Sequence, residues 1–247
     1  MPPGRREPAS GPDDVEPCLG EVISRVIPVT PLPTDPLGWA EGWLPEDDAL
    51  RAARSRAAEL GVQAIDPLTG AALRFLAGVT NAKAVAEVGT GTGISGLWML
   101  RGMTEDGILT SIDAESEHQR LAREVFSEAG VPAARARLIV GRALEVLPRL
   151  ADGAYDLVHA DADPADVPDL LPEMVRTVRV GGVIAFSHAM NGGRVADPAA
   201  RDAATLALRE AGRAIRERDD LLAVLLPIGD GLVAAVRREP ASAPDAA

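Results

Sequence analysis

From residue 83 onward, the chain alternates short apolar segments with longer amphipathic ones. The apolar segments predict strands over residues 83–88, 107–112, 136–140, 154–160, 180–187, 220–227 and 231–237. The segments between them predict helices over residues 93–103, 115–129, 142–150, 165–178 and 198–218. This alternation is typical of an α/β fold with a doubly wound, mainly parallel sheet. Because only Pro227 to Gly231 separate the last two strands, we expect an antiparallel hairpin at one edge.

Two further helices precede this alternating region. Acidic residues 46–48 suit the first turn of a helix that ends at Leu60. Asp66 followed by Pro67 is a typical helix start and predicts a second helix over about 67–79. We expect one domain over residues 41–239. Residues 1–40, which are rich in proline, and residues 240–247 are predicted to be disordered tails.

Composition excludes several classes of partner. The chain has 247 residues, a formal net charge of −12 and 47% hydrophobic residues. Phosphate backbones attract clustered Lys and Arg, so nucleic acid and anionic membranes are not expected partners. No apolar run reaches the roughly 18 residues of a membrane helix. The single cysteine, Cys18, cannot form an internal disulfide, and no apolar segment follows Arg5-Arg6, which predicts a cytoplasmic protein.

A glycine-rich loop follows the first predicted strand. The apolar run 84–88 leads into Gly89-Thr90-Gly91-Thr92-Gly93, and a helix is predicted to begin directly afterwards. Glycines allow a positive φ and close approach of the backbone to a ligand, and the first N–H groups of the helix remain free. The segment therefore predicts a ligand site.

Glu87 favours one ligand over the others. Gly91-x-Gly93-x-x-Gly96 matches the letters of the dinucleotide motif, but its first glycine lies three residues beyond Val88 rather than directly after the strand. A carboxylate at the end of the strand would repel a pyrophosphate and would attract an ammonium group. We therefore predict S-adenosylmethionine (SAM), which carries an amino group and no phosphate. A nicotinamide or flavin nucleotide and a purely structural turn are the alternatives.

The ends of the next two strands carry candidates for the adenosine moiety. Asp113 lies 20 residues beyond Gly93, where a carboxylate can accept both hydroxyls of a ribose. Its alternative role is a helix N-cap. After the third strand, Gly141-Arg142-Ala143 leaves room for an adenine ring, or else forms an ordinary turn.

The fourth strand ends in two carboxylates, Asp161 and Asp163. Asp161 follows the strand directly and is predicted to face the ligand, whereas Asp163 is predicted to cap the helix after Pro164. Of the three histidines, we expect His118 to be solvated on a polar helix face and His159 to lie in the core. His188 ends the fifth strand and is either a catalytic or substrate contact or a surface histidine.

Five segments together resemble the bacterial branch of the catechol and caffeoyl-CoA type of class I SAM-dependent O-methyltransferases. They are Glu87–Ser95, Ser111–Asp113, Tyr155–Asp163, Val180–Ile184 and Leu226–Gly231. The resemblance covers about residues 45–238 and implies the seven-stranded Rossmann-like methyltransferase sheet with its antiparallel terminal strand.

The resemblance also implies roles for individual residues. Glu87 would hold the methionine amino group, with Gly89 and Thr90 lining the loop and Ser95 binding the carboxylate end. Asp113 would take the ribose hydroxyls beside Ala114, and Ala143 would contact adenine. Ile65 would offer its backbone to the methionine end, and Asp161 would lie beside the transferred methyl group.

The chain departs from the family at the metal site. Pro164 replaces the usual lysine, and Ser187-His188 replaces the Asp-Asn pair that, with the equivalent of Asp161, binds the metal. Because Mg²⁺ prefers several oxygen ligands, we predict no tightly bound catalytic metal. A neutral phenol then needs a base, and His188 is the predicted base with Asp161 as its catalytic partner.

The predicted activity is methyl transfer from SAM to an oxygen of a small, phenolic acceptor. The acceptor pocket is expected from the helices of 41–80, residues 190–195 and the terminal hairpin, and the resemblance implies a homodimer. The alternatives are a catalytically silent SAM-binding regulatory protein and a nucleotide-dependent oxidoreductase.

Overall fold

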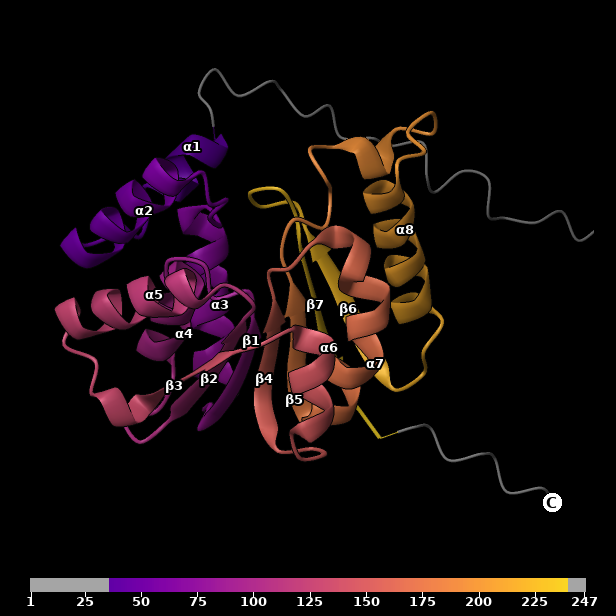
Figure 1. Ribbon diagram of the computed structural model, residues 1–247. Helices are drawn as coiled ribbons and strands as arrows, with labels where there is room; N and C mark the ends of the chain where they lie inside the picture. The colour runs from indigo at the N-terminus through magenta and orange to yellow at the C-terminus, as the bar shows by residue number, and fades with distance from the viewer. Residues whose placement is uncertain (1–35, 240–247) are drawn as a thin grey trace, which may run out of the picture. The chain divides into compact units, whose positions relative to one another are not determined.

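The computed structural model describes residues 36–239, and the predictions for residues 1–35 and 240–247 lie outside them. The described residues form a seven-stranded sheet of order β3-β2-β1-β4-β5-β7-β6 (Figure 1). All pairs are parallel except those of β7 with β5 and β6. This confirms the predicted fold class and the terminal hairpin. The strands are β1 (Ala84–Val88), β2 (Ile108–Asp113), β3 (Ala136–Val140), β4 (Tyr155–Ala160), β5 (Val178–Phe186), β6 (Leu221–Leu226) and β7 (Leu232–Arg237).

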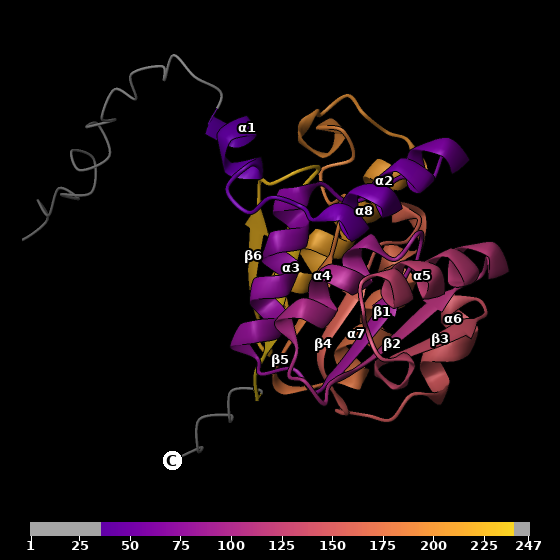
Figure 2. The same cartoon turned by 90° about the vertical axis from the view of Figure 1, so that its left-hand side faces the viewer.

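Helices cover both faces of the sheet. One face carries α2 to α5, which face the viewer in Figure 2, and the other carries α6 to α8 (Figures 1 and 2). No helix within residues 36–239 has the length and apolarity to cross a bilayer. The helices are α1 (Pro36–Glu41), α2 (Asp48–Leu60), α3 (Pro67–Val79), α4 (Ile94–Gly102), α5 (Ser116–Glu128), α6 (Ala143–Val146), α7 (Val167–Thr177) and α8 (Ala203–Arg216).

The central strand β1 is buried on both sides. Val85 packs into the core under α2 to α5, and its neighbour Ala86 packs into the core under α6 to α8. Successive side chains of a strand point to opposite faces, so a strand covered on both sides must be apolar almost throughout. Glu87 is the exception in β1 and is itself fully buried.

Three predicted elements differ most from the structure. Helix α1 occupies residues 36–41, so it begins within the segment predicted as a tail. Helix α8 begins at Ala203 rather than 198, because Asp202 caps it by accepting the Thr205 N–H at 3.0 Å. The predicted helix 142–150 is α6 followed by a 3₁₀ turn (Leu147–Arg149), and Pro148 supplies no N–H to continue an α-helix.

The sheet order brings two distant loops together. From β1 the chain winds outward through β2 and β3, and it returns to the other side of β1 with β4 and β5. Such a reversal leaves a crevice beyond the carboxyl ends of the two central strands. The backbone N–H of Asp161, after β4, donates to the carbonyl of Val88, at the end of β1, at 2.8 Å. The glycine loop and the acidic segment therefore meet at this crevice.

Candidate functional site

Two adjoining cavities lie at the crevice. The first, here named the loop cavity, has a volume of about 110 Å³ and lies between the glycine loop and residues 62–65. The second, the strand-end cavity, has about 300 Å³ and lies beyond β1, β2 and β4. Both are lined by Gly89, Asp113, His118 and Asp161. One extended ligand can therefore pass from one cavity to the other.

The glycine loop depends on the missing side chain of Gly89. Its φ is +87°, and a Cβ placed there would lie 1.9 Å from the backbone oxygen of Asp161. Gly91 and Gly93 also have positive φ, 49° and 86°. The loop therefore turns tightly under the cavity, and β1 and β4 approach each other closely.

Glu87 lies beneath the loop, where it accepts two hydroxyl hydrogen bonds. Its side chain is fully buried; Oε1 accepts from Ser95 Oγ at 2.5 Å and Oε2 from Ser111 Oγ at 2.6 Å. Since the Ser111 proton is used on Glu87, the Thr90 hydroxyl donates to Ser111 Oγ at 2.6 Å, and Gln119 Nε2 in turn donates to Thr90 at 2.8 Å. Glu87 lines neither cavity, so its predicted contact with the amino group stays a prediction.

Asp113 ends β2 with its carboxylate in the crevice. Oδ2 accepts the Gly91 N–H at 3.0 Å, and Oδ1 accepts the Glu115 N–H at 2.9 Å. The residue at the N-cap of α5 is Glu115. Asp113 is therefore not the cap of this helix, and it belongs to both cavities.

His118 corrects one expectation. The residue is more than a solvated histidine on a polar face: its side chain is only 24% exposed, and Nδ1 lies 3.1 Å from Asp113 Oδ2. It follows Asp113 by five residues, so the first turn of α5 carries its ring back over the strand end. That spacing is the signal in the sequence that could have identified it.

Asp161 and His188 come together, although they are 27 positions apart in the sequence. His188 Nε2 lies 3.4 Å from Asp161 Oδ1, and both side chains are 16% exposed. Burial raises the pKa of the Asp161 carboxyl, and Glu87 adds to the rise, while His159 and His188 oppose it. Asp163 accepts the Ala165 N–H at 2.9 Å and caps a 3₁₀ turn, as predicted for a cap.

Two residues that the sequence did not indicate complete the surroundings of His188. Gln63 Nε2 lies 3.1 Å from His188 Nδ1, and Asp230 Oδ2 lies 3.5 Å from the same nitrogen. An amide N–H only donates, so Nδ1 of the neutral ring accepts from Gln63 and the ring proton lies on Nε2. That nitrogen is buried, forms no hydrogen bond and has the Asp161 carboxylate 3.4 Å away. His188 has a backbone φ of +57°, which is unusual for a residue other than glycine.

His159 is a core residue, as predicted, and has a polar partner. It is fully buried, and its Nε2 lies 2.9 Å from Ser187 Oγ. Its Nδ1 has no hydrogen-bond partner and lies 3.8 Å from Glu87 Oε1. The buried Ser187 hydroxyl is thus held by the core rather than by the cavities.

The remaining predicted cofactor residues line the two cavities. Thr90, Ser95 and Ile65 border the loop cavity, and the Ile65 carbonyl accepts from Arg54 Nη1 at 2.8 Å. Ala114 and Ala143 border the strand-end cavity. The structure therefore brings every predicted cofactor residue except Glu87 to the crevice, although the contacts with a cofactor stay predictions.

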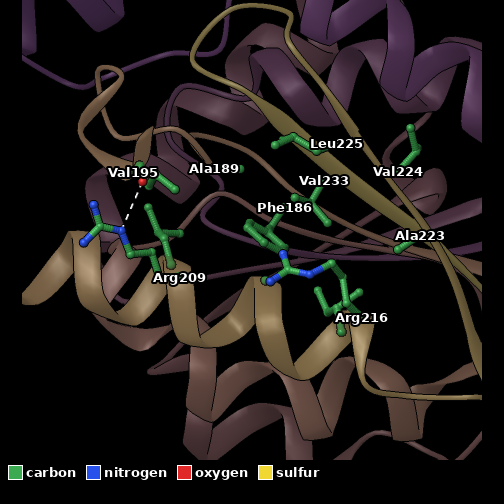
Figure 3. Close-up of a pocket in the computed structure, with 12 residues that line it drawn as sticks. Phe186, Ala189, Val195, Arg209, Arg216, Ala223, Val224, Leu225 and Val233 are labelled. Atoms are coloured by element: carbon green, nitrogen blue, oxygen red, sulfur yellow. Dashed lines mark hydrogen bonds between the residues drawn. The ribbon is translucent and has the colours of Figure 1, made fainter. Parts of the chain in front are cut away.

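A third cavity lies away from this crevice (Figure 3). It has about 270 Å³ and lies between α8 and the β6–β7 hairpin. Its lining contains no carboxylate or histidine, and Arg209 Nε donates to the Val195 carbonyl at 3.0 Å. Without converging acid–base groups it offers no chemistry comparable to that of the crevice.

The parallel sheet, the glycine loop and the carboxylates at the strand ends define a Rossmann-like methyltransferase. Residues 48–238 match the family model described as O-methyltransferase. The chain belongs to this O-methyltransferase family. The comparison confirms the predicted class, a SAM-dependent O-methyltransferase, and gives no support to a regulatory protein or an oxidoreductase.

Relatives and solved structures agree with this assignment. A Mycobacterium marinum protein assigned as an O-methyltransferase is 57% identical over 198 residues, 80% of this chain and 88% of the relative. A Corynebacterium glutamicum structure is 33% identical with a TM-score of 0.77, over 83% of this chain and 96% of that one. The O-methyltransferase TomG from Streptomyces achromogenes, solved with SAM, is 29% identical with a TM-score of 0.74, over 81% and 94%.

Proposed function

We propose that this chain transfers the methyl group of SAM to an oxygen of a small phenolic acceptor, with His188 as the general base and Asp161 as its partner. The observation that supports this most directly is the placement of His188 between Asp161 on one ring nitrogen and Gln63 and Asp230 on the other. SAM would place its methionine end in the loop cavity and its adenosine in the strand-end cavity.

The ring of His188 has the orientation that a base requires. With its proton on Nε2 toward Asp161, Nδ1 is the free base on the side of Gln63 and Asp230. An acceptor hydroxyl that displaces the Gln63 amide would lose its proton to Nδ1 as its oxygen attacks the methyl carbon and the sulfonium leaves as a neutral thioether. The imidazolium formed would lie between the carboxylates of Asp161 and Asp230. These would stabilise its charge, as the aspartate of a catalytic triad stabilises the protonated histidine. The sulfonium is already an electrophile, so positioning and deprotonation are what the protein must supply.

The residues at the family's metal position do not suit a hard cation. Mg²⁺ requires near-octahedral oxygen ligands. Here Ser187 Oγ is engaged with His159 Nε2, and the adjacent ligand would be an imidazole. Within residues 36–239, no group of three or more His, Cys, Asp or Glu is arranged to hold a metal ion. We propose that turnover does not require a metal ion.

The test is methyl transfer from labelled SAM to a panel of phenols, with and without EDTA. The proposal expects a labelled methyl ether on at least one phenol, at a rate that EDTA leaves unchanged. Loss of activity in EDTA, with recovery on addition of Mg²⁺, would refute the metal-independent mechanism. Transfer only to nitrogen or carbon would refute the phenolic acceptor.

We also propose a homodimer, a cytoplasmic location and no nucleic-acid partner. The net charge of −12 supports the absence of a nucleic-acid partner, since phosphate would be repelled. The single cysteine, which cannot form an internal disulfide, supports the cytoplasmic location. Large apolar side chains exposed on α1 and the turn after it, on α3 and on β6 support the dimer, because burying them would remove apolar area from water. They are Leu37, Trp39, Trp43, Phe75, Val79, Leu222, Val224 and Leu225. Sedimentation at several concentrations tests this, and a monomer throughout would refute it.

A further inference from the structure

The Asp113 carboxylate already has most of its hydrogen-bonding capacity filled. A carboxylate offers about four acceptor positions on its two oxygens. Oδ2 takes the Gly91 N–H at 3.0 Å and faces His118 Nδ1 at 3.1 Å, and Oδ1 takes the Glu115 N–H at 2.9 Å. Three donors therefore surround it before any ligand arrives. One position is left, whereas a ribose offers two hydroxyls.

His118 offers the missing acceptor. A carboxylate oxygen only accepts, so Nδ1 of the ring carries the proton that faces Asp113. In the neutral ring Nε2 is then an acceptor. Nε2 has no partner within the described part of the chain, and it is not among the buried polar atoms that lack one, so it is open to solvent. His118 borders both the loop cavity and the strand-end cavity, where a ribose would join the two ends of the cofactor.

Other charged groups border the same cavities. Asp161, Asp163 and Asp166 lie across the strand-end cavity with Arg142, and Glu117 precedes His118 on α5. Arg142 is 4.0 Å from Glu145, and Glu117 accepts from Arg120. Since neither of these two groups bonds to Asp113, the histidine is the side chain that holds its carboxylate.

We infer that His118 is a ribose-binding residue of the SAM site: Nδ1–H fixes the Asp113 carboxylate, and Nε2 accepts one ribose hydroxyl while Asp113 accepts the other. This assignment rests on the proposed function and replaces the expectation that Asp113 alone holds both hydroxyls. It makes His118 a determinant of affinity for the ribose and leaves the chemistry at His188 untouched.

The test compares His118→Ala with the unaltered protein by titration calorimetry. The ligands are S-adenosylhomocysteine and its 2′-deoxy and 3′-deoxy analogues. Because one hydrogen bond is lost, His118→Ala should bind S-adenosylhomocysteine about tenfold more weakly than the unaltered protein does. For the analogue that lacks the hydroxyl bound by His118, the affinities of the two proteins should differ by less than about twofold. In turnover, KM for SAM should rise by a similar factor while kcat stays within about twofold. The matched control is Arg123→Ala, an exposed residue of α5 that borders neither cavity and should bind all three ligands normally.

Three results would overturn the assignment. The first is an unchanged affinity of His118→Ala for S-adenosylhomocysteine. The second is an equal loss of affinity of His118→Ala for all three ligands, and the third is the same loss of affinity in Arg123→Ala. His118→Gln provides a second variant if the alanine protein does not fold; partial recovery of the discrimination supports the assignment, and none contradicts it. If the unaltered protein gives no heat with S-adenosylhomocysteine, the proposed function fails, and the role of His118 with it.

Discussion

Replacing Gly89 by alanine tests whether β1 and β4 must touch for the site to form. Alanine at a φ of +87° costs about 1–2 kcal/mol by itself. The new Cβ would also lie 1.9 Å from the Asp161 oxygen and 2.7 Å from its carbonyl carbon, so the Asp161 backbone must move. Overpacking of this kind adds about 1–3 kcal/mol. We expect Gly89→Ala to lower the free energy of unfolding by about 2–5 kcal/mol.

The matched control is Gly130→Ala, which isolates the backbone cost. Gly130 has a φ of +72°, and a Cβ there meets nothing within 4 Å. Urea unfolding should show a loss of only about 1–2 kcal/mol for the control. Because the Asp161 backbone must move, its side chain should shift relative to His188 and the cavities. Gly89→Ala should therefore also bind S-adenosylhomocysteine more weakly and turn over more slowly, and the control should do neither. Equal losses of stability in the two variants, with normal binding in both, would refute the close contact.

Three further predictions concern titratable side chains at and beneath the crevice. His188→Ala should lower kcat by about 10²–10⁴-fold with nearly unchanged SAM affinity, and unaltered turnover would remove His188 from the mechanism. Because the pKa of Asp161 is raised in the folded protein, the folded state binds this proton more tightly than the unfolded state does. The free energy of unfolding should therefore fall as pH rises from about 4 through the raised pKa. Asp161→Asn does not titrate, and its stability relative to the unaltered protein should therefore grow with pH across this window in urea melts; a constant difference would contradict the shift. Glu87→Gln replaces an acceptor oxygen by a donor amide facing Ser95 or Ser111, and should destabilise the protein by about 1–3 kcal/mol; unchanged unfolding would show that the network adapts.

Periodicity in the sequence was enough to predict the layers of this protein. Strands buried on both faces must be apolar, and helices on a sheet must have one apolar side, so both leave a local pattern. The loop after β1 was also predictable from the sequence, because a turn with positive φ favours glycine whatever the surrounding tertiary structure. Asp163 as a cap and His159 as a core residue followed from their neighbours in the chain.

The tertiary structure alone decided which polar groups meet. Gln63, His188 and Asp230 come from three distant segments, and no periodicity reports a contact between loops. The polar helix face of His118 indicates a solvated residue, whereas the end of β2 beneath it supplies its partner, Asp113. Local patterns record what each segment buries, but the pairing of groups at the crevice depends on the order of strands in the sheet. The sequence therefore determined the fold and the type of site, and the structure determined which nitrogen faces which carboxylate.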